Sequence, residues 1–284
     1  MTEKISTTDS GRKLFFGLFI FPLIIAFGMA LLLCAVVLLT SEKETPETLI
    51  TAIKTGARAK RAQKAYELSN ELNSRKASLR DGSLLREIIY IVEDEKDFDS
   101  LTRRYMTIAL SHFHEPAAVT ALAGALGDSD EDVRLYALWS LGALRAAEAA
   151  PRVAHFLADD KESLRTMAAY VLGVFGDRSF TASIKPLLDD ASADVRWNAA
   201  LALARLGDDS GFRILKEMVE RDTYKNFSMN EDNIEQVMIN ATKGLALIPR
   251  AESAGILQSV ARNERNLKVR QAAMDAIRVA EGRL

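Results

Sequence analysis

The sequence has few of the residues from which metal and disulfide sites are built. Its 284 residues include one cysteine, Cys34, and three histidines, His112, His114 and His155. A single cysteine excludes a disulfide framework and a cysteine-based metal cluster within the chain. His112 and His114 would point about 200° apart on a helix, whereas ligation from one helix uses residues three or four apart. We therefore expect no catalytic, metal-binding or cofactor-binding residue.

Motifs for phosphate binding, serine catalysis and nucleic-acid binding are also absent from the sequence. It contains no G-x-x-x-x-G-K-[ST] or G-x-G-x-x-G loop, and no serine stands in a G-x-S-x-G setting. The formal net charge is −2, and the charges are mixed in sign, where nucleic-acid binding would call for a basic stripe interleaved with aromatic residues. We predict that the protein is not an enzyme and binds no nucleic acid.

Charged residues are missing from Leu14 to Ser41. The core of this run, "LFFGLFIFPLIIAFGMALLLCAVVLL", is long enough to cross the roughly 30 Å hydrocarbon layer as a helix, and Pro22 does not prevent this. A cleaved signal peptide has a shorter apolar region and small residues at its cleavage site, which "VLLTSEK" lacks. A lipoprotein signal would need small residues before Cys34 and polar ones after it. We therefore interpret residues 14–40 as a retained transmembrane helix after a short tail, residues 1–13, with Cys34 facing lipid.

The charges on either side of this run bear on its orientation. Arg12 and Lys13 precede it, and the sequence "EKE" follows it at residues 42–44. This arrangement favours a cytoplasmic N-terminus, with the large domain on the extracytoplasmic side of the membrane. A basic cluster within residues 54–64 would instead suit an anionic cytoplasmic leaflet or be a solvated helix face. We expect a single-pass membrane protein with an extracytoplasmic domain.

One helical pattern recurs in the middle of the chain. Val133, Leu164 and Val195 each open a copy, at equal intervals along the chain, and we number each copy from this residue as position 0. Position +1 is arginine, position +4 alanine, position +8 leucine, and position −5 aspartate in every copy. Positions 0, +4 and +8 lie on one face of a helix. Self-similarity at a fixed period indicates a solenoid, in which each helix pair buries its apolar face against the next.

The residues around each copy predict where its helix starts and stops. Asp130 and Ser192 can accept hydrogen bonds from the free N–H groups of a helix start. Gly176 and Gly207 can take the left-handed conformation that ends a helix. Each unit is therefore expected to be a helix, a short turn and a second helix.

The pattern extends outward from the three central copies. Val237 and Val269 take position 0 of two later copies, and the step from Val195 to Val237 is longer than the others. Leu101 takes position 0 of an earlier copy, in which Tyr105 departs from alanine at +4. Six units are thus expected in residues 83–284. Residues 41–82 form either a juxtamembrane helical linker, such as a plain stalk helix, or a degenerate first repeat within residues 46–72.

The segments "DSDEDVRLYALWSLGAL", "DKESLRTMAAYVLGVFGD" and "DASADVRWNAALALARLGD" resemble HEAT repeats, in particular the short bacterial kind also found in phycobilisome lyases. The resemblance implies an all-α, right-handed α-solenoid of six or seven stacked helix pairs in a bacterial protein. It also implies charged ladders between neighbouring units. The predicted ladder residues are Asp128, Asp159, Asp190, Asp232, Arg134, Arg165, Arg196 and Arg270. Met238 replaces the arginine of the fifth unit, so the ladder should break there.

Two features are candidates for partner binding. Trp139 at position +6 and Trp197 at position +2 are either exposed anchors for a partner or packing residues between repeats. The insertion "RDTYKNFSMNE" departs from the repeat and includes Tyr224, Phe227 and Met229, which lie either on a binding loop or on a tolerated surface insertion.

These observations favour a non-catalytic scaffold, anchored in the bacterial inner membrane, that binds a membrane-associated protein such as a transporter. Two alternatives remain: an enzyme similar to the HEAT-type bilin lyases, and a purely structural spacer. Deoxyhypusine hydroxylases, which are also HEAT proteins, hold iron with several His-Glu pairs. This sequence has one such pair, His114 and Glu115, so that activity is not expected.

Overall fold

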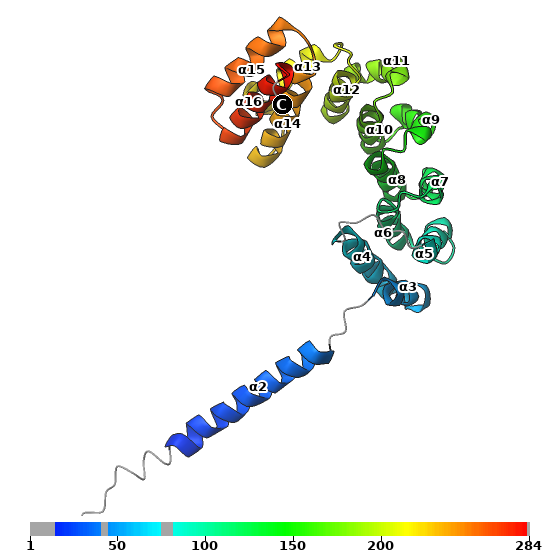
Figure 1. Cartoon of the computed structure of the whole chain (residues 1–284), viewed down its shortest axis with the longest axis vertical. Coiled ribbons are helices and arrows are strands. Elements are labelled where there is room, and N and C mark those ends of the chain that lie inside the picture. Colours follow the sequence, from blue (N-terminus) through cyan, green and yellow to red (C-terminus); the bar gives the residue numbers. More distant parts are fainter. Residues whose placement is uncertain (1–14, 41–44, 75–81, 283–284) are drawn as a thin grey trace, which may run out of the picture. The chain divides into compact units, whose positions relative to one another are not determined.

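The structure is a computed structural model, and it describes residues 15–40, 45–74 and 82–282. The chain divides into two compact units, Met1–Thr45 and Pro46–Leu284. All regular secondary structure in the described residues is helical (Figure 1).

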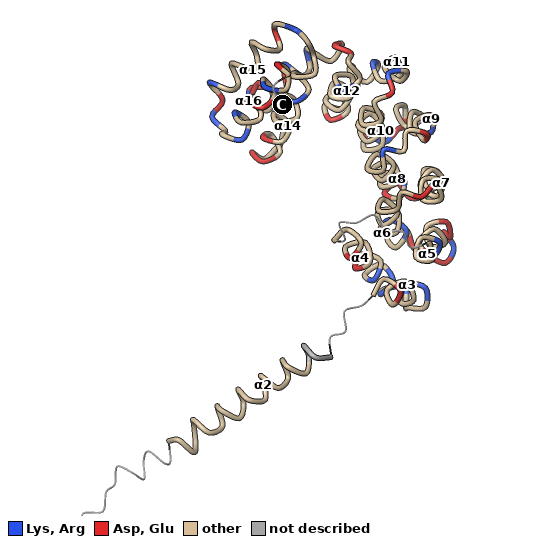
Figure 2. Tube along the Cα trace, viewed as in Figure 1, with Lys and Arg blue, Asp and Glu red and all other residues tan. Residues whose placement is uncertain are grey.

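The first unit contains one apolar helix. A π-helical turn, η1 (Phe16–Ile20), leads into α2 (Phe21–Thr40). The segment Phe16–Val36 has a mean hydropathy of 2.7, and none of it is buried against the rest of the chain. Figure 2 shows no charged residue along the described part of α2. The segment is long and apolar enough to span a membrane, a property that signal sequences share.

The second unit consists of helix pairs. The pairs are α3 (Pro46–Thr55) with α4 (Arg58–Ser74), α5 (Gly82–Glu93) with α6 (Ser100–Leu110), α7 (Pro116–Ala125) with α8 (Glu131–Leu144), α9 (Ala150–Ala154) with α10 (Glu162–Phe175), α11 (Thr181–Ile184) with α12 (Ala193–Arg205), α13 (Phe212–Met218) with α14 (Glu231–Ala246), and α15 (Ala251–Asn263) with α16 (Leu267–Ala280). Short 3₁₀ turns flank α9 and α11, and another, η6 (Arg221–Asn226), lies in the insertion.

The second helix of each pair packs against the second helix of the next, from α4 through α6, α8, α10, α12 and α14 to α16. Within this unit the row from α4 to α14 lines the inner side of an arc, and α5, α7, α9 and α11 lie on its outer side (Figure 1). The predicted all-α solenoid of HEAT-type helix pairs is therefore confirmed.

The buried face of each central copy is the one that the sequence indicates. The residues at positions 0, +4 and +8 of the three copies are all fully buried: Val133, Ala137, Leu141, Leu164, Ala168, Leu172, Val195, Ala199 and Leu203. Asp130 accepts hydrogen bonds from the N–H groups of Asp132 and Val133, as expected of an N-cap. Ser192 occupies the same place, but its side chain makes no capping bond. Gly176 and Gly207 have positive φ angles of 78° and 76°.

The first of the six predicted units needs a correction, because its position 0 lies one place further along the chain. Leu101, the predicted position 0, is 40% exposed, whereas Thr102, Met106 and Leu110 are fully buried. Position 0 is therefore Thr102, and the step from it to Val133 equals the step between the central copies. The apolar pattern did not indicate Thr102, because threonine is polar. Its hydroxyl donates a hydrogen bond to the Asp99 carboxylate, so the side chain can be buried.

Residues 46–74 form a helix pair that joins the solenoid, and not one plain stalk helix. Leu49, Ile53, Leu68 and Leu72 are buried in the same core as the next repeats. Helix α4 packs on α6, and α3 packs on α5. Seven helix pairs therefore stack in the described part of this unit.

Candidate binding face

The ladder between repeats is present, and its best-formed rung starts at a residue that the sequence analysis missed. Arg103 donates from Nε and Nη2 to the two carboxylate oxygens of Asp128, at 3.0 and 2.8 Å. Both side chains are less than 5% exposed. Arg165 and Asp190 repeat this bidentate geometry at 2.8 and 3.0 Å. The identical sequence separation of 25 in both pairs is the signal that would have identified Arg103.

The predicted ladder arginines also brace their own repeats. Arg134, Arg165 and Arg196 each donate from Nη1 to the main-chain carbonyl of the aspartate at position −5, at 2.7–2.8 Å. Asp159 is the position −5 aspartate of the middle central copy. Its carboxylate accepts a hydrogen bond from the main-chain N–H of Lys161. The hydrogen bond from Arg165 lowers the pKa of Asp190, so this pair stays charged at neutral pH. Arg165 thus links two repeats through Asp190, whereas the bonds of Arg134 and Arg196 lie within their own repeats.

The insertion bridges the predicted break at the fifth unit. Met238 is fully buried there. Arg221, from η6, donates to Glu264 at 2.8 Å and to Glu231 at 2.6 Å. Glu264 stands at position −5 relative to Val269, where the other repeats carry the ladder acid. Burial alone would raise the pKa of Glu264, but the bonds from Arg221 and the main chain outweigh it and lower the pKa.

The two remaining ladder predictions lie elsewhere than expected. Asp232 is exposed in the first turn of α14. The hydrogen bond with Glu235 raises the pKa of Lys268, and the charge of Asp232 adds only a smaller effect. Arg270 is half-buried, and its Nε has no hydrogen-bond partner among the described residues. Neither side chain forms a rung.

Four of the five predicted partner-binding residues form one cluster, in which Phe227 remains 37% exposed. Trp197 is 6% exposed, and its ring lies 5.9 Å from that of Tyr224 and 5.4 Å from that of Phe227. The buried Tyr224 hydroxyl donates to the carbonyl of Met218, and Met229 packs against the same core. Most of this aromatic surface therefore fixes the insertion to α12.

Trp139 is different, because it is 39% exposed on α8. Tyr170 stands at the same position, +6, of the next repeat and is 37% exposed. Position +6 lies at about 240° around the helix, opposite the buried positions. We call the side chains at positions +2, +3, +6 and +10 of the second helices the concave face, because these helices line the inner side of the arc (Figure 1).

Cations and aromatic rings interleave on this face. Arg104 lies over the rings of Tyr105 and Tyr136, 5.5 and 5.9 Å from their centres, and is paired with Asp132 at 2.6 Å. Further along, Arg205 lies 5.3 Å from the centre of the Tyr170 ring. The face therefore presents apolar and aromatic surface together with arginines that lie over aromatic rings.

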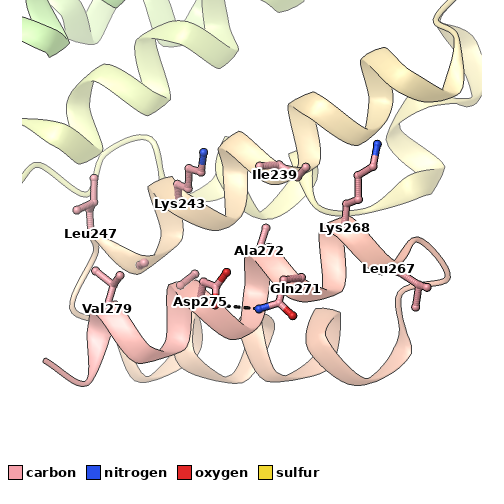
Figure 3. Close-up of a pocket in the computed structure, with 11 residues that line it drawn as sticks. Ile239, Lys243, Leu247, Leu267, Lys268, Gln271, Ala272, Asp275 and Val279 are labelled. Carbon is pink, nitrogen blue, oxygen red and sulfur yellow. Dashed lines mark hydrogen bonds between the residues drawn. The ribbon is translucent and has the colours of Figure 1, made fainter. Parts of the chain in front are cut away.

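A groove of about 670 Å³ continues the concave face between α14 and α16. Figure 3 shows it lined by side chains from both helices. We call this the C-terminal groove; it is lined by Ile239, Lys243, Ala246, Leu247, Leu267, Lys268, Gln271, Ala272, Asp275, Ala276 and Val279. Lys243 and Asp275 stand at position +6, and Leu247 and Val279 at +10. Single-residue patterns did not reveal it, because its residues combine only when two helices pack.

His112 and His114 lie in the turn between α6 and α7. Burial lowers the pKa of His112, and His114 adds to this. No group of three or more His, Cys, Asp or Glu residues in the described part of the chain could hold a metal ion.

Comparisons with known proteins agree with this architecture. A model of the HEAT-repeat family matches residues 88–173 and 156–229, which together make up half of the chain. The comparison with curated proteins finds no match.

Among solved structures, the complex of CpcE and CpcF of phycocyanin lyase from Nostoc sp. PCC7120 is similar at a TM-score of 0.57 and 19% identity, over 86% of this chain and 97% of that one. The archaeal HEAT-like repeats protein from Thermococcus onnurineus NA1 gives 0.45 and 14%, over 85% and 99%. Human deoxyhypusine hydroxylase gives 0.37 and 16%, over 84% of both chains. At 19% identity the likeness to the phycocyanin lyase complex concerns the fold alone.

Proposed function

Because the chain belongs to the HEAT-repeat family, we propose that it is a non-catalytic, membrane-anchored scaffold whose concave face binds a protein partner at the membrane. Stacked repeats create an extended concave surface of the kind that solenoid proteins use for binding. The fold supports this function in general terms, and the chemistry of the face supports it in particular.

The observation that carries the proposal is the position of the exposed apolar side chains. In the three central repeats the residues at positions 0, +4 and +8 are fully buried, whereas Trp139, Tyr170, Leu247 and Val279 are 37–49% exposed at positions +6 and +10. All four lie on the concave face. Contiguous exposed apolar surface marks interaction sites, and tryptophan and tyrosine are enriched among residues that dominate binding energy.

The apolar helix supports the membrane part of the proposal. We place η1 and α2 across the bacterial inner membrane, with the N-terminus in the cytoplasm and the solenoid on the extracytoplasmic side. An anchored solenoid is held beside other spanning proteins, so a membrane complex such as a transporter is the partner that we propose. A protein that stays soluble without detergent, after expression with residues 1–45 intact, would refute the anchor.

The test is affinity purification of the tagged full-length protein from its native membranes in mild detergent, followed by mass spectrometry. We expect a stoichiometric membrane protein to accompany the wild type. The double variant Trp139→Ala/Tyr170→Ala should lose it, whereas Arg213→Ala, a change of a 73% exposed side chain on α13, should retain it. A wild-type protein that emerges alone, even after cross-linking, would contradict the proposal and favour a spacer.

The lyase-like alternative is supported by fold similarity alone, and fold does not imply function. It predicts that the full-length protein attaches a bilin to an apo-phycobiliprotein. Covalent attachment above the rate without protein would overturn the non-catalytic assignment.

A further inference from the structure

We infer that the C-terminal groove binds an amphipathic helix of the partner, with an acidic side chain beside its apolar stripe. This inference rests on the proposed function, because the groove is part of the concave face. It goes further by stating which segment of the face makes the contact and what chemistry the partner presents there.

The dimensions of the groove suit two to three turns of helix. Along α14 its apolar wall runs from Ile239 to Leu247, a rise of about 12 Å. Along α16 it runs from Leu267 to Val279, a rise of about 18 Å. Leu247, Leu267 and Val279 are 44%, 72% and 49% exposed, so the walls are not covered by the chain itself.

Two helices packed side by side leave a trough into which the ridge of a third helix fits. Helix-in-groove recognition uses apolar anchors at i, i+3 or i+4, and i+7. A helix of about eight to twelve residues has this pattern within the length of the walls. Small residues at Ala246, Ala272 and Ala276 allow such a helix to approach closely.

The charges at the rim of the groove indicate which charge the bound helix should carry beside its apolar stripe. Lys268 is engaged by Glu235 at 2.9 Å. Asp275 accepts from Gln271 at 2.9 Å and from Arg278 at 3.3 Å.

Lys243 projects from α14 at the groove (Figure 3), and no carboxylate of the described residues bonds to it. The uncompensated charge at this rim is therefore positive, and a partner carboxylate next to the apolar stripe would complement it.

The first experiment uses site-specific photo-cross-linking in native membranes. A benzoylphenylalanine is placed in the full-length protein at Gln271 in the groove, at Tyr170 on the middle of the concave face, or at Arg213 on α13 as a control. After irradiation, the attached peptide is sequenced by mass spectrometry. We expect the probe at Gln271 to label a segment with apolar residues at helical spacing and an acidic residue beside them, and the probe at Arg213 to label nothing specific.

The two probes separate failure of the groove from failure of the proposed function. Labelling of a protein from Tyr170 but not from Gln271 would overturn the groove assignment and leave the scaffold function standing. Labelling of lipid from Gln271 would overturn it as well, in favour of an acyl chain. An absence of protein labelling from both positions would refute both proposals.

The second experiment measures the affinity of the full-length protein in detergent for a synthetic peptide of the labelled segment. Leu247→Asp should weaken binding roughly tenfold or more, since it places a charge on the apolar wall. Lys243→Glu should weaken it roughly two- to fivefold, as expected for an exposed charge pair.

A peptide with its acidic residue changed to lysine should prefer the Lys243→Glu variant. The matched control Lys225→Glu, a charge reversal of a 69% exposed side chain outside the groove, should leave the affinity unchanged. Equal effects of Lys243→Glu and Lys225→Glu would contradict the charge complementarity.

Discussion

Removal of the Arg103 guanidinium should destabilise the solenoid more than any other single change in the ladder. In Arg103→Met a flexible apolar side chain replaces the arginine. Asp128 then keeps its negative charge with a side chain only 3% exposed, and it retains a hydrogen bond from the N–H of Asp130. The carbonyl of Phe98 also loses the bond from Arg103 Nη1 at 2.7 Å. The variant therefore leaves a buried charge without its counter-ion.

Breaking a buried ion pair by removing one partner costs about 3–5 kcal/mol. The same change at Arg165 provides a matched comparison, because this arginine makes the same two bonds to Asp190. The side chains of Arg165 and Asp190 are 19% and 12% exposed, so water can reach the Asp190 carboxylate once the arginine is removed. We expect Arg165→Met to cost about 1 kcal/mol.

The assay is urea unfolding of the full-length protein in detergent, followed by far-ultraviolet circular dichroism. A double variant, Arg103→Met/Asp128→Asn, serves as a check on the cause. Asparagine removes the buried charge but keeps an acceptor for the turn, so the double variant should be more stable than Arg103→Met alone by about 1–2 kcal/mol. The reasoning would be refuted if Arg103→Met cost no more than Arg165→Met, or if the double variant were the least stable of the three.

Three further comparisons test other parts of the structure. In the same urea assay, Gly173→Ala should destabilise the protein by about 1–3 kcal/mol, because the new Cβ would lie 2.7 Å from a main-chain atom of α12. Gly124 has open space around it, so Gly124→Ala should stabilise the protein by about 0.5–1 kcal/mol. Trp197→Ala should cost about 3–5 kcal/mol, and Trp139→Ala less than about 1 kcal/mol while weakening capture of the partner; equal costs would contradict their different burial. The hydrogen bond from Arg165 lowers the pKa of Asp190 below 3.8. The ionised Asp190 therefore contributes to stability above that pH, and this contribution is lost as the pH falls below it. In unfolding curves recorded across pH, the stability difference between wild type and Asp190→Asn should shrink below about pH 4.

The sequence by itself determined the repeat, its buried face and the apolar helix, because all three depend on local spacing. A fixed repeat period and a helical turn of about 3.6 residues place Val133, Ala137 and Leu141 on one side whatever lies next to them. The same local chemistry made Asp130 an N-cap and Gly176 a helix end. The length of the uncharged run likewise needs no tertiary contact to be recognised.

Only the tertiary structure decided which side chains remain exposed and which charges meet. Trp197 and Trp139 are the same residue type on second helices of nearby repeats, yet the insertion covers the first and leaves the second open. Arg221 takes over the missing rung by reaching Glu264, 43 residues away, and no local pattern records such a contact. The C-terminal groove arises in the same way: its walls belong to two helices whose packing distance, and not their sequence, sets the space between them.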